Sequence, residues 1–214
     1  MKKFAVILAG CGVKDGSEIH EAVLALYSIK KLGADYSIFA PDVDFHEVNH
    51  ITIQETENVR NALIEAARIA RGNIKPLSEF NEEEFDAMIL PGGFGAMKNL
   101  CNYAFVGANF EVNKDVKKAV LDMYNAGKPL GFMCIAPLIA AKLIPGCILT
   151  IGHDKDTANV IEQLDCEHVV TESGEVCIDR DNNIFSTACY MLNVDIAGVG
   201  VCAQNLVEAM LESM

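Results

Sequence analysis

The first forty residues constrain the fold more than any other stretch of this chain. Residues 3–9 form a continuous apolar run, which is typical of a strand buried on both faces of a sheet. A polar turn follows, and then a segment with apolar residues at helical spacing that ends at Gly33. A second apolar run, residues 34–40, is stopped by Pro41. A strand, a helix and a strand in this order predict a parallel sheet.

The remaining sequence continues this alternation up to residue 143 and then changes. Before residue 143 we expect an extended piece over 45–53, helices over 57–71 and 112–125, and strands over 85–90 and 129–133. After it we expect short strands over 147–151, 168–170, 175–178 and 184–188, and helices over 157–164 and 194–212. The turns at 172–175 and 179–183 suggest hairpins. We therefore expect a single α/β domain over residues 1–214, with a mostly parallel sheet and a small C-terminal β-hairpin region.

Charge and composition narrow the class of protein. The 214 residues are 51% hydrophobic and carry a net charge of −13 without a basic patch, which argues against a nucleic-acid partner. No apolar run is long enough to span a bilayer, so we expect no membrane partner. The N-terminal apolar run is short and lacks a cleavage-like pattern, so it is interpreted as a strand rather than a signal peptide. The eight cysteines form no C-x-x-C pair, and a chain of this length needs no disulfides, which favours a cytoplasmic protein.

One cysteine lies where a strand is predicted to become a helix. The apolar run 129–133 ends at Cys134, and Pro137 suits the first turn of the following helix. Unpaired N–H groups and the positive end of a helix dipole favour the reactive thiolate at such a place. The alternative is a buried core thiol, since free cysteine is among the most buried residue types. Core positions are expected for the cysteines that lie within apolar runs, namely Cys147, Cys177, Cys189 and Cys202.

Three loops are predicted to meet at the carboxyl edge of the sheet, where ligands of open parallel sheets bind: 11–17, 91–95 and 133–136. The backbone N–H groups of Gly93 and Ile135 could form an oxyanion hole beside the thiolate. Ser17 is expected to cap the first helix, which would put Glu18 in its first turn.

The carboxyl group of Glu18 could orient the thiol and relay protons, or it could only complement the helix dipole. His20 and Glu21 compete for the same role, and Cys11 is a second thiol on this edge.

The motifs around these loops resemble a known family. Residues 16–22 (Gly-Ser-Glu-Ile-His-Glu-Ala), 91–95 (Pro-Gly-Gly-Phe-Gly) and 131–137 (Gly-Phe-Met-Cys-Ile-Ala-Pro) are similar to the ElbB-like branch of the ThiJ/PfpI family, within the class I glutamine amidotransferase-like superfamily. The likeness covers nearly the whole chain, including Lys98-Asn99-Leu100. It implies a flavodoxin-like three-layer sandwich, commonly dimeric, with Cys134 as nucleophile and Glu18 as its carboxyl partner. The binding residues then expected are Gly93, Ile135, Cys11 and Asn99.

The resemblance also implies an activity. ElbB-like proteins are associated with glyoxalase-type chemistry, a glutathione-independent and cofactor-free conversion of small 2-oxoaldehydes to 2-hydroxy acids, and with isoprenoid biosynthesis. We accordingly expect a small aldehyde substrate, a homodimer, no cofactor and no metal. Protease-like members carry His where this chain has Ile135, and no His-x-Glu follows Cys134, which argues against peptidase and glutaminase chemistry. A non-enzymatic redox-sensing or stress-response protein that uses the same cysteine is the alternative.

Overall fold

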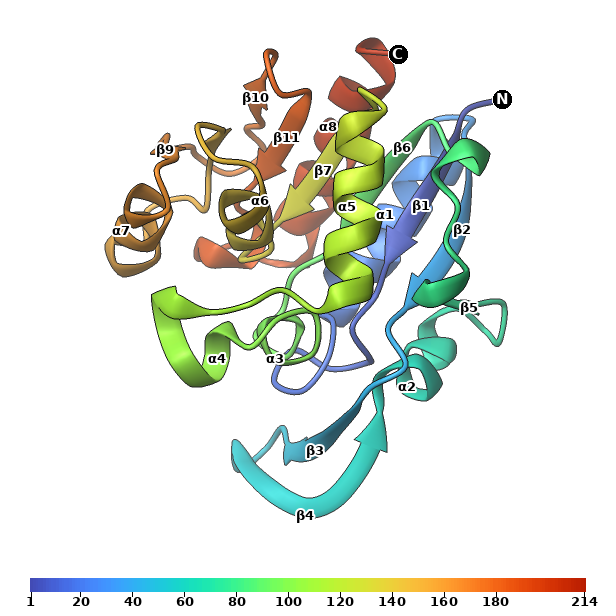
Figure 1. Ribbon diagram of the computed structural model, residues 1–214, viewed down its shortest axis with the longest axis vertical. Helices are drawn as coiled ribbons and strands as arrows, with labels where there is room; N and C mark the ends of the chain where they lie inside the picture. The colour runs from blue at the N-terminus through green and yellow to red at the C-terminus, as the bar shows by residue number, and fades with distance from the viewer.

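The computed structural model describes residues 1–214 and arranges them in three layers around a central sheet (Figure 1). The strands of this sheet are β1 (Lys3–Ile7), β2 (Asp35–Ala40), β5 (Lys75–Pro76), β6 (Ala87–Leu90), β7 (Leu130–Met133), β10 (Cys177–Asp179) and β11 (Ile184–Thr187). Their order is β10-β11-β7-β6-β1-β2-β5, and every neighbouring pair is parallel except β10 with β11. The predicted α/β fold with a mostly parallel sheet is confirmed.

Helices and two small sheets complete the chain. The α-helices are α1 (Ile19–Lys31), α2 (Ala62–Ile69), α3 (Ala96–Asn99), α4 (Tyr103–Val106), α5 (Lys114–Asn125), α6 (Pro137–Leu143), α7 (Lys155–Gln163) and α8 (Ile196–Glu212). Single turns of 3₁₀ helix span Leu77–Glu79, Glu82–Glu84, Gly107–Asn109 and Cys189–Met191. Outside the main sheet, β3 (Asp44–Asn49) pairs with β4 (Gln54–Asn61), and β8 (Ile148–Leu149) pairs with β9 (Glu167–His168). None of the helices combines the length and the apolar character that crossing a membrane requires.

Two cores lie on opposite faces of the sheet because successive side chains of a strand point to opposite sides. On one face, alternate residues of β1 pack with α1 and α8; these residues are Phe4, Val6 and Leu8. On the other face, Ala5, Ile7 and Ala9 pack with α5 and α6. Figure 1 shows α5 in front of the sheet and α1 and α8 behind it. The continuous apolar run that predicted β1 therefore reflects burial on both faces.

The six parallel strands of the main sheet bring their carboxyl ends to one edge, at the bottom of Figure 1, where the β3–β4 hairpin projects. The hairpin is fastened to the loop after β1 by two hydrogen bonds. The N–H of Val48 donates to Asp15 Oδ2 at 2.8 Å, and the N–H of Lys14 donates to His50 Nε2 at 3.2 Å. The hairpin and the first loop are thus one rigid part of the edge.

The structure corrects two local predictions and adds two helices. The helix predicted over 57–71 begins only at Ala62, since residues 54–61 pair with β3 as strand β4. The turn at 172–175 is not a hairpin, because β9 and β10, which flank it, belong to different sheets. The hairpin predicted at 179–183 is confirmed by the antiparallel pairing of β10 with β11. The one-turn helices α3 and α4 have too few residues to leave a periodic signal in the sequence.

Candidate active site

Cys134 lies at a sharp turn between β7 and α6. Its φ angle is +57°, a left-handed conformation that non-glycine residues rarely adopt. The turn is held because the N–H of Cys134 donates to the carbonyl oxygen of Thr187 at 2.9 Å, and the N–H of Ala136 donates to that of Met133 at 3.0 Å. Pro137 occupies the first turn of α6, as predicted. Backbone strain of this kind concentrates at functional sites, where the surrounding structure enforces it.

Gly92 and Gly93 let the loop after β6 lie directly against this turn. A Cβ atom at position 92 would lie 2.6 Å from Cys134 Cβ and 2.7 Å from the carbonyl oxygen of Met133. At Gly93, which has a φ angle of +106°, a Cβ atom would lie 2.5 Å from the backbone nitrogen of Glu18. Only glycine therefore fits between the start of α1 and Cys134, and this close approach brings three loops together.

Glu21 is the carboxyl group that faces Cys134. It is completely buried, and its Oε2 accepts the N–H of Gly92 at 2.9 Å. Burial first, and the charge of Glu18 second, raise the pKa of Glu21 to about 8, whereas hydrogen bonding toward Cys134 and the backbone of Gly92 and Tyr190 lowers it. Its Oε1 nevertheless has no protein partner with full hydrogen-bond geometry. The raised pKa favours the protonated, neutral form of this side chain at pH 7, and Oε1 is the oxygen that a further group could bond.

Glu18 has a different position from the one expected. It is the N-cap residue of α1, where its Oε2 accepts the N–H of Glu21 at 2.7 Å. Its own N–H donates to the carbonyl oxygen of Gly92 at 2.9 Å. Ser17 does not cap the helix, because its Oγ accepts the N–H of Ala9 at 2.8 Å instead. The carboxyl partner expected at Glu18 is therefore replaced, in this geometry, by Glu21 one helical turn later.

The environment of the Cys134 sulfur differs from the expected electropositive one. Burial first, and the charge of Glu21 second, raise the pKa of Cys134 well above its usual value. Hydrogen bonding from the backbone N–H groups of Gly93 and Ile135 lowers it, and their expected role as an oxyanion hole stays a prediction. Cys134 and Glu21 are coupled acids, and ionisation of one opposes ionisation of the other. At neutral pH the pair holds at least one proton.

The other predicted residues lie around this centre. Asn99 is structural in its contacts, because its Nδ2 donates to the carbonyl oxygens of Ala9 and Asp15, both at 2.8 Å. Cys11 is half-buried, and the charged groups that shift its pKa are Glu65, Arg68 and Asp15 rather than members of the Cys134 pair. These contacts of Cys11 and Asn99 are with groups other than Cys134 and Glu21, and the expected role of both residues in binding stays a prediction.

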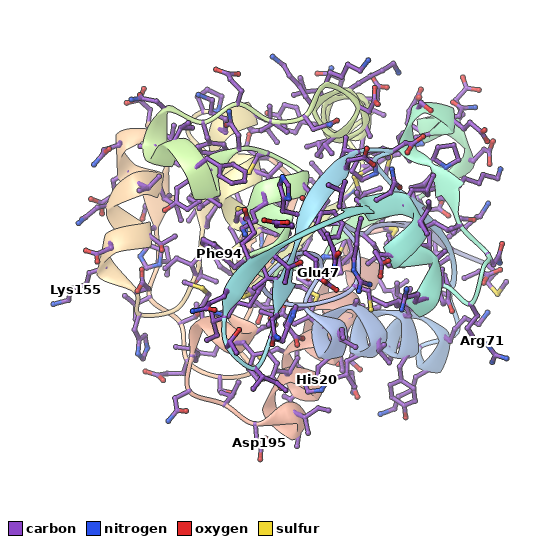
Figure 2. All side chains as sticks on the ribbon, turned by 90° about the horizontal axis from the view of Figure 1, so that it is seen from below. His20, Glu47, Arg71, Phe94, Lys155 and Asp195 are labelled. Carbon is purple, nitrogen blue, oxygen red and sulfur yellow. The ribbon has the colours of Figure 1, made fainter.

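The two histidines considered from the sequence, His20 and His153, have partners other than Cys134. His20 Nδ1 lies 2.7 Å from the hydroxyl of Tyr190, at the exposed start of α1. His153 pairs with Glu172 at 3.2 Å. Figure 2, which views the carboxyl edge of the sheet, shows His20, Phe94 and Glu47 near the middle of this face and Lys155, Arg71 and Asp195 toward its periphery. Nowhere in the described chain do three His, Cys, Asp or Glu side chains gather as a metal site would require.

A spacing signal for Glu21 is present in the sequence. Glu21, Ala25 and Ile29 recur every four residues and are all buried, so they share the inner face of α1. Two apolar residues of the same helix, Ile19 and Val23, are instead 42% and 46% exposed. A carboxylate in line with buried residues is the pattern that would have identified Glu21.

Comparisons with known proteins agree with this architecture. The human mitochondrial protein named glutamine amidotransferase-like class 1 domain-containing protein 3 is 39% identical over 96% of this chain and 82% of its own length. The rat mitochondrial ES1 protein homologue is 38% identical over 96% of this chain and 83% of its own length. No family model matches the chain.

Solved structures share the fold. An isoprenoid biosynthesis protein with an amidotransferase-like domain from Ehrlichia chaffeensis superposes with a TM-score of 0.93 and 35% identity, covering 100% of this chain and 99% of its own. Glyoxalase III from Candida albicans has a TM-score of 0.61 and 14% identity over 97% of each chain, which shows a common fold alone.

These findings correct one prediction and establish the family. The cytoplasmic localisation expected from the sequence is contradicted, because the human and rat relatives are both named as mitochondrial proteins. Identity above 30% over four-fifths of a relative's length shows the family. The chain belongs to the glutamine amidotransferase-like class 1 domain family, together with the ES1 proteins.

Proposed function

We propose that this protein is a cofactor-free, glyoxalase-type enzyme of the ElbB-like branch, which converts small 2-oxoaldehydes such as methylglyoxal and glyoxal to 2-hydroxy acids. One observation carries the proposal. A cysteine in a strained turn faces a fully buried glutamic acid, and two backbone N–H groups face the same sulfur. This combination supplies a nucleophile, a proton carrier and an oxyanion site without a histidine.

The first step is addition of the thiol to the aldehyde. Loss of the Cys134 proton to solvent gives a thiolate, whose attack on the aldehyde carbon forms a hemithioacetal. The N–H groups of Gly93 and Ile135 stabilise the negative charge that develops on the aldehyde oxygen, which then takes up the proton of neutral Glu21.

Glu21 carries the proton in the second step. Left as a carboxylate by its first proton transfer, Glu21 removes the hydrogen from the former aldehyde carbon and returns it as a proton to the neighbouring ketone carbon. The hydroxyl proton on the first carbon passes to the ketone oxygen, which leaves a thioester of the 2-hydroxy acid. Water then hydrolyses the thioester and restores the thiol. A base near neutral pH is efficient in such transfers, and the pKa of about 8 places Glu21 in that range.

The burial of the site favours a small substrate. Cys134 is 7% exposed and Glu21 is fully buried, so only a compact group can reach both. The fold shared with glyoxalase III of Candida albicans is compatible with this chemistry. Because the identity to that protein is low, the support for this chemistry is the Cys134–Glu21 geometry of this chain.

Steady-state conversion of methylglyoxal to lactate tests the proposal. We expect turnover by the purified protein without glutathione, and loss of turnover in Cys134→Ser. The matched control is Cys101→Ser, since Cys101 is also buried but bonds to the carbonyl oxygen of Met97 on the opposite core. Equal turnover in wild type and Cys134→Ser would show that the aldehyde reacts elsewhere or without the enzyme.

A second candidate is a redox sensor in which Cys134 is oxidised reversibly to a sulfenic acid. The free Oε1 of the neutral Glu21 favours it, because this oxygen could bond to an oxidised sulfur. Peroxide treatment followed by mass analysis distinguishes the two. Oxidation of Cys134 at low peroxide, together with no methylglyoxal turnover, would support the sensor.

A further inference from the structure

A second pair of cysteines lies in the small parallel sheet, away from the proposed active site. Cys147 directly precedes β8 and Cys166 directly precedes β9. The register of this sheet pairs Ile148 with Glu167, and the N–H of Glu167 donates to the carbonyl oxygen of Cys147 at 2.9 Å. Continuing the register back by one residue places Cys147 opposite Cys166.

The two side chains point to the same side of their strands. Paired residues of neighbouring strands share a face, and the strands are about 4.8 Å apart. A disulfide requires Cα atoms about 4.4–6.8 Å apart, so this backbone already satisfies the separation. The two sulfur atoms lie 3.4 Å apart, with the Cys147 thiol donating to the Cys166 sulfur. Closing the bond needs only a small movement of the sulfurs.

We propose that Cys147 and Cys166 form a reversible disulfide, which makes this pair a redox modification site independent of Cys134. Both sulfurs belong to the core on the α5 and α6 face, whereas Cys134 belongs to the core on the α1 and α8 face. The sheet therefore separates the two thiol sites. A bond between residues 147 and 166 would also tie together the two ends of the segment that carries α7.

The oxidant is a small organic disulfide such as oxidised glutathione. The Cys166 thiolate, after loss of its proton, attacks one sulfur of the oxidant, and the other half leaves as a thiolate. The Cys147 thiolate then displaces the second half from the mixed disulfide. Two protein thiols have lost two protons and two electrons, and one glutathione disulfide has become two thiols.

Cys166 reacts first because it is the more accessible and more acidic member of the pair. It is 7% exposed, whereas Cys147 is completely buried. The hydrogen bond to Cys166 and burial raise the pKa of Cys147, which keeps that thiol protonated while Cys166 ionises.

Differential alkylation of the native full chain tests the proposal. The protein is incubated with oxidised glutathione, free thiols are blocked, and peptides are mapped before and after reduction. We expect a 147–166 linked peptide, lighter by two hydrogens than the sum of its halves, which disappears on reduction. Fragmentation must separate Cys166 from Cys177, because no Lys or Arg lies between them. The linked peptide should be lost in both Cys147→Ser and Cys166→Ser.

Two controls distinguish this pairing from other thiol chemistry. Cys177→Ser, which removes a thiol just as buried as Cys166, and Cys134→Ser should both keep the linked peptide. The proposal fails if Cys166 is found only in its reduced or glutathione-bound form while the protein is folded, or if the bond forms only after denaturation. Loss of the link in Cys134→Ser would show that the pair depends on the active site and is not independent. Failure here leaves the methylglyoxal assay, and hence the proposed enzyme, unaffected.

Discussion

At the scale of single residues, the site depends on two acids that oppose each other's ionisation. Glu21 is buried against Cys134, and its charge raises the pKa of the thiol, whereas hydrogen bonding with Cys134 lowers the pKa of Glu21. The N–H groups of Gly93 and Ile135 offset this at the sulfur, since they favour the thiolate. Glu18 acts on Glu21 from the helix cap, where its charge helps to keep Glu21 protonated. The two glutamates should therefore respond differently to substitution.

Glu21→Gln should reduce methylglyoxal turnover by about 10²-fold or more, because an amide cannot carry the proton between the two carbons. The fold should persist, since the amide oxygen can still accept the N–H of Gly92. Glu18→Gln should lower stability by about 1 kcal/mol at most, because the amide oxygen can still accept the N–H of Glu21 but the favourable charge at the helix N-terminus is lost, and it should leave turnover within a few-fold. Turnover and chemical denaturation of both variants check this. A larger loss of turnover in Glu18→Gln than in Glu21→Gln would return the catalytic role to Glu18.

The pH profile of Cys134 alkylation should also change in Glu21→Gln. In wild type, the sulfur and the carboxyl group compete for the last proton of the pair. Cys134 is therefore fully ionised only well above pH 8, which is about the pKa of Glu21. Without the carboxylate charge, alkylation by iodoacetamide should reach its maximum at a lower pH. Cys11 is the internal control, because Glu21 is not among the groups that shift its pKa. Superimposable Cys134 profiles in the two proteins would contradict the coupling.

At the scale of elements, the sequence was most informative where burial alone decides the structure. The strands β1, β2, β6 and β7 were predicted from short apolar runs, and the turn at Cys134 from the junction of such a run with a helix that begins at Pro137. The polar strand β4 was mistaken for part of a helix. Its conformation depends on partners distant in the sequence, since Glu47 on β3 accepts hydrogen bonds from Thr56 and Asn58. Local periodicity carries no record of such pairing.

Helix α8 contains two glycines that should respond in opposite ways to alanine. A Cβ atom at Gly200 would meet only Leu24 Cδ2, at 3.8 Å, so Gly200→Ala should stabilise the protein by about 1 kcal/mol through helix propensity. A Cβ atom at Gly198 would lie 3.0 Å from Val194 Cβ, so Gly198→Ala should gain less or lose stability. Thermal unfolding of both variants measures the difference. Equal stabilisation by the two substitutions would mean that Val194 moves away from the new Cβ atom at position 198 without a cost in free energy.

At the scale of the whole molecule, the question is how one buried ionisable group affects the pH dependence of stability in a strongly acidic chain. There are 30 acidic and 17 basic residues, and the net charge is −13. Glu21 is completely buried on the α1 side of the sheet and ionises at very different pH in the two states.

The free energy of unfolding should therefore fall as the pH rises from about 5 to about 8. The pKa of Glu21 is about 8 in the folded protein against an ordinary value of 4.5, so the folded state binds more protons throughout this window. The stabilisation that this group contributes is complete below pH 4.5 and is lost as the pH rises through about 8. Glu21→Gln should flatten this part of the profile and make the variant the more stable protein at its alkaline end.

Urea denaturation at fixed ionic strength across this range measures the effect in wild type and Glu21→Gln. Glu47→Gln is the matched control, because hydrogen bonds from Asn58 and Thr56 lower the pKa of Glu47. A carboxyl group with a lowered folded pKa loses its contribution only as the pH falls into the acid range, so Glu47→Gln should keep the wild-type slope between about pH 5 and about pH 8. If Glu21→Gln keeps that slope as well, Glu21 is already ionised in the folded protein, and the neutral acid assumed for the proton transfer does not exist.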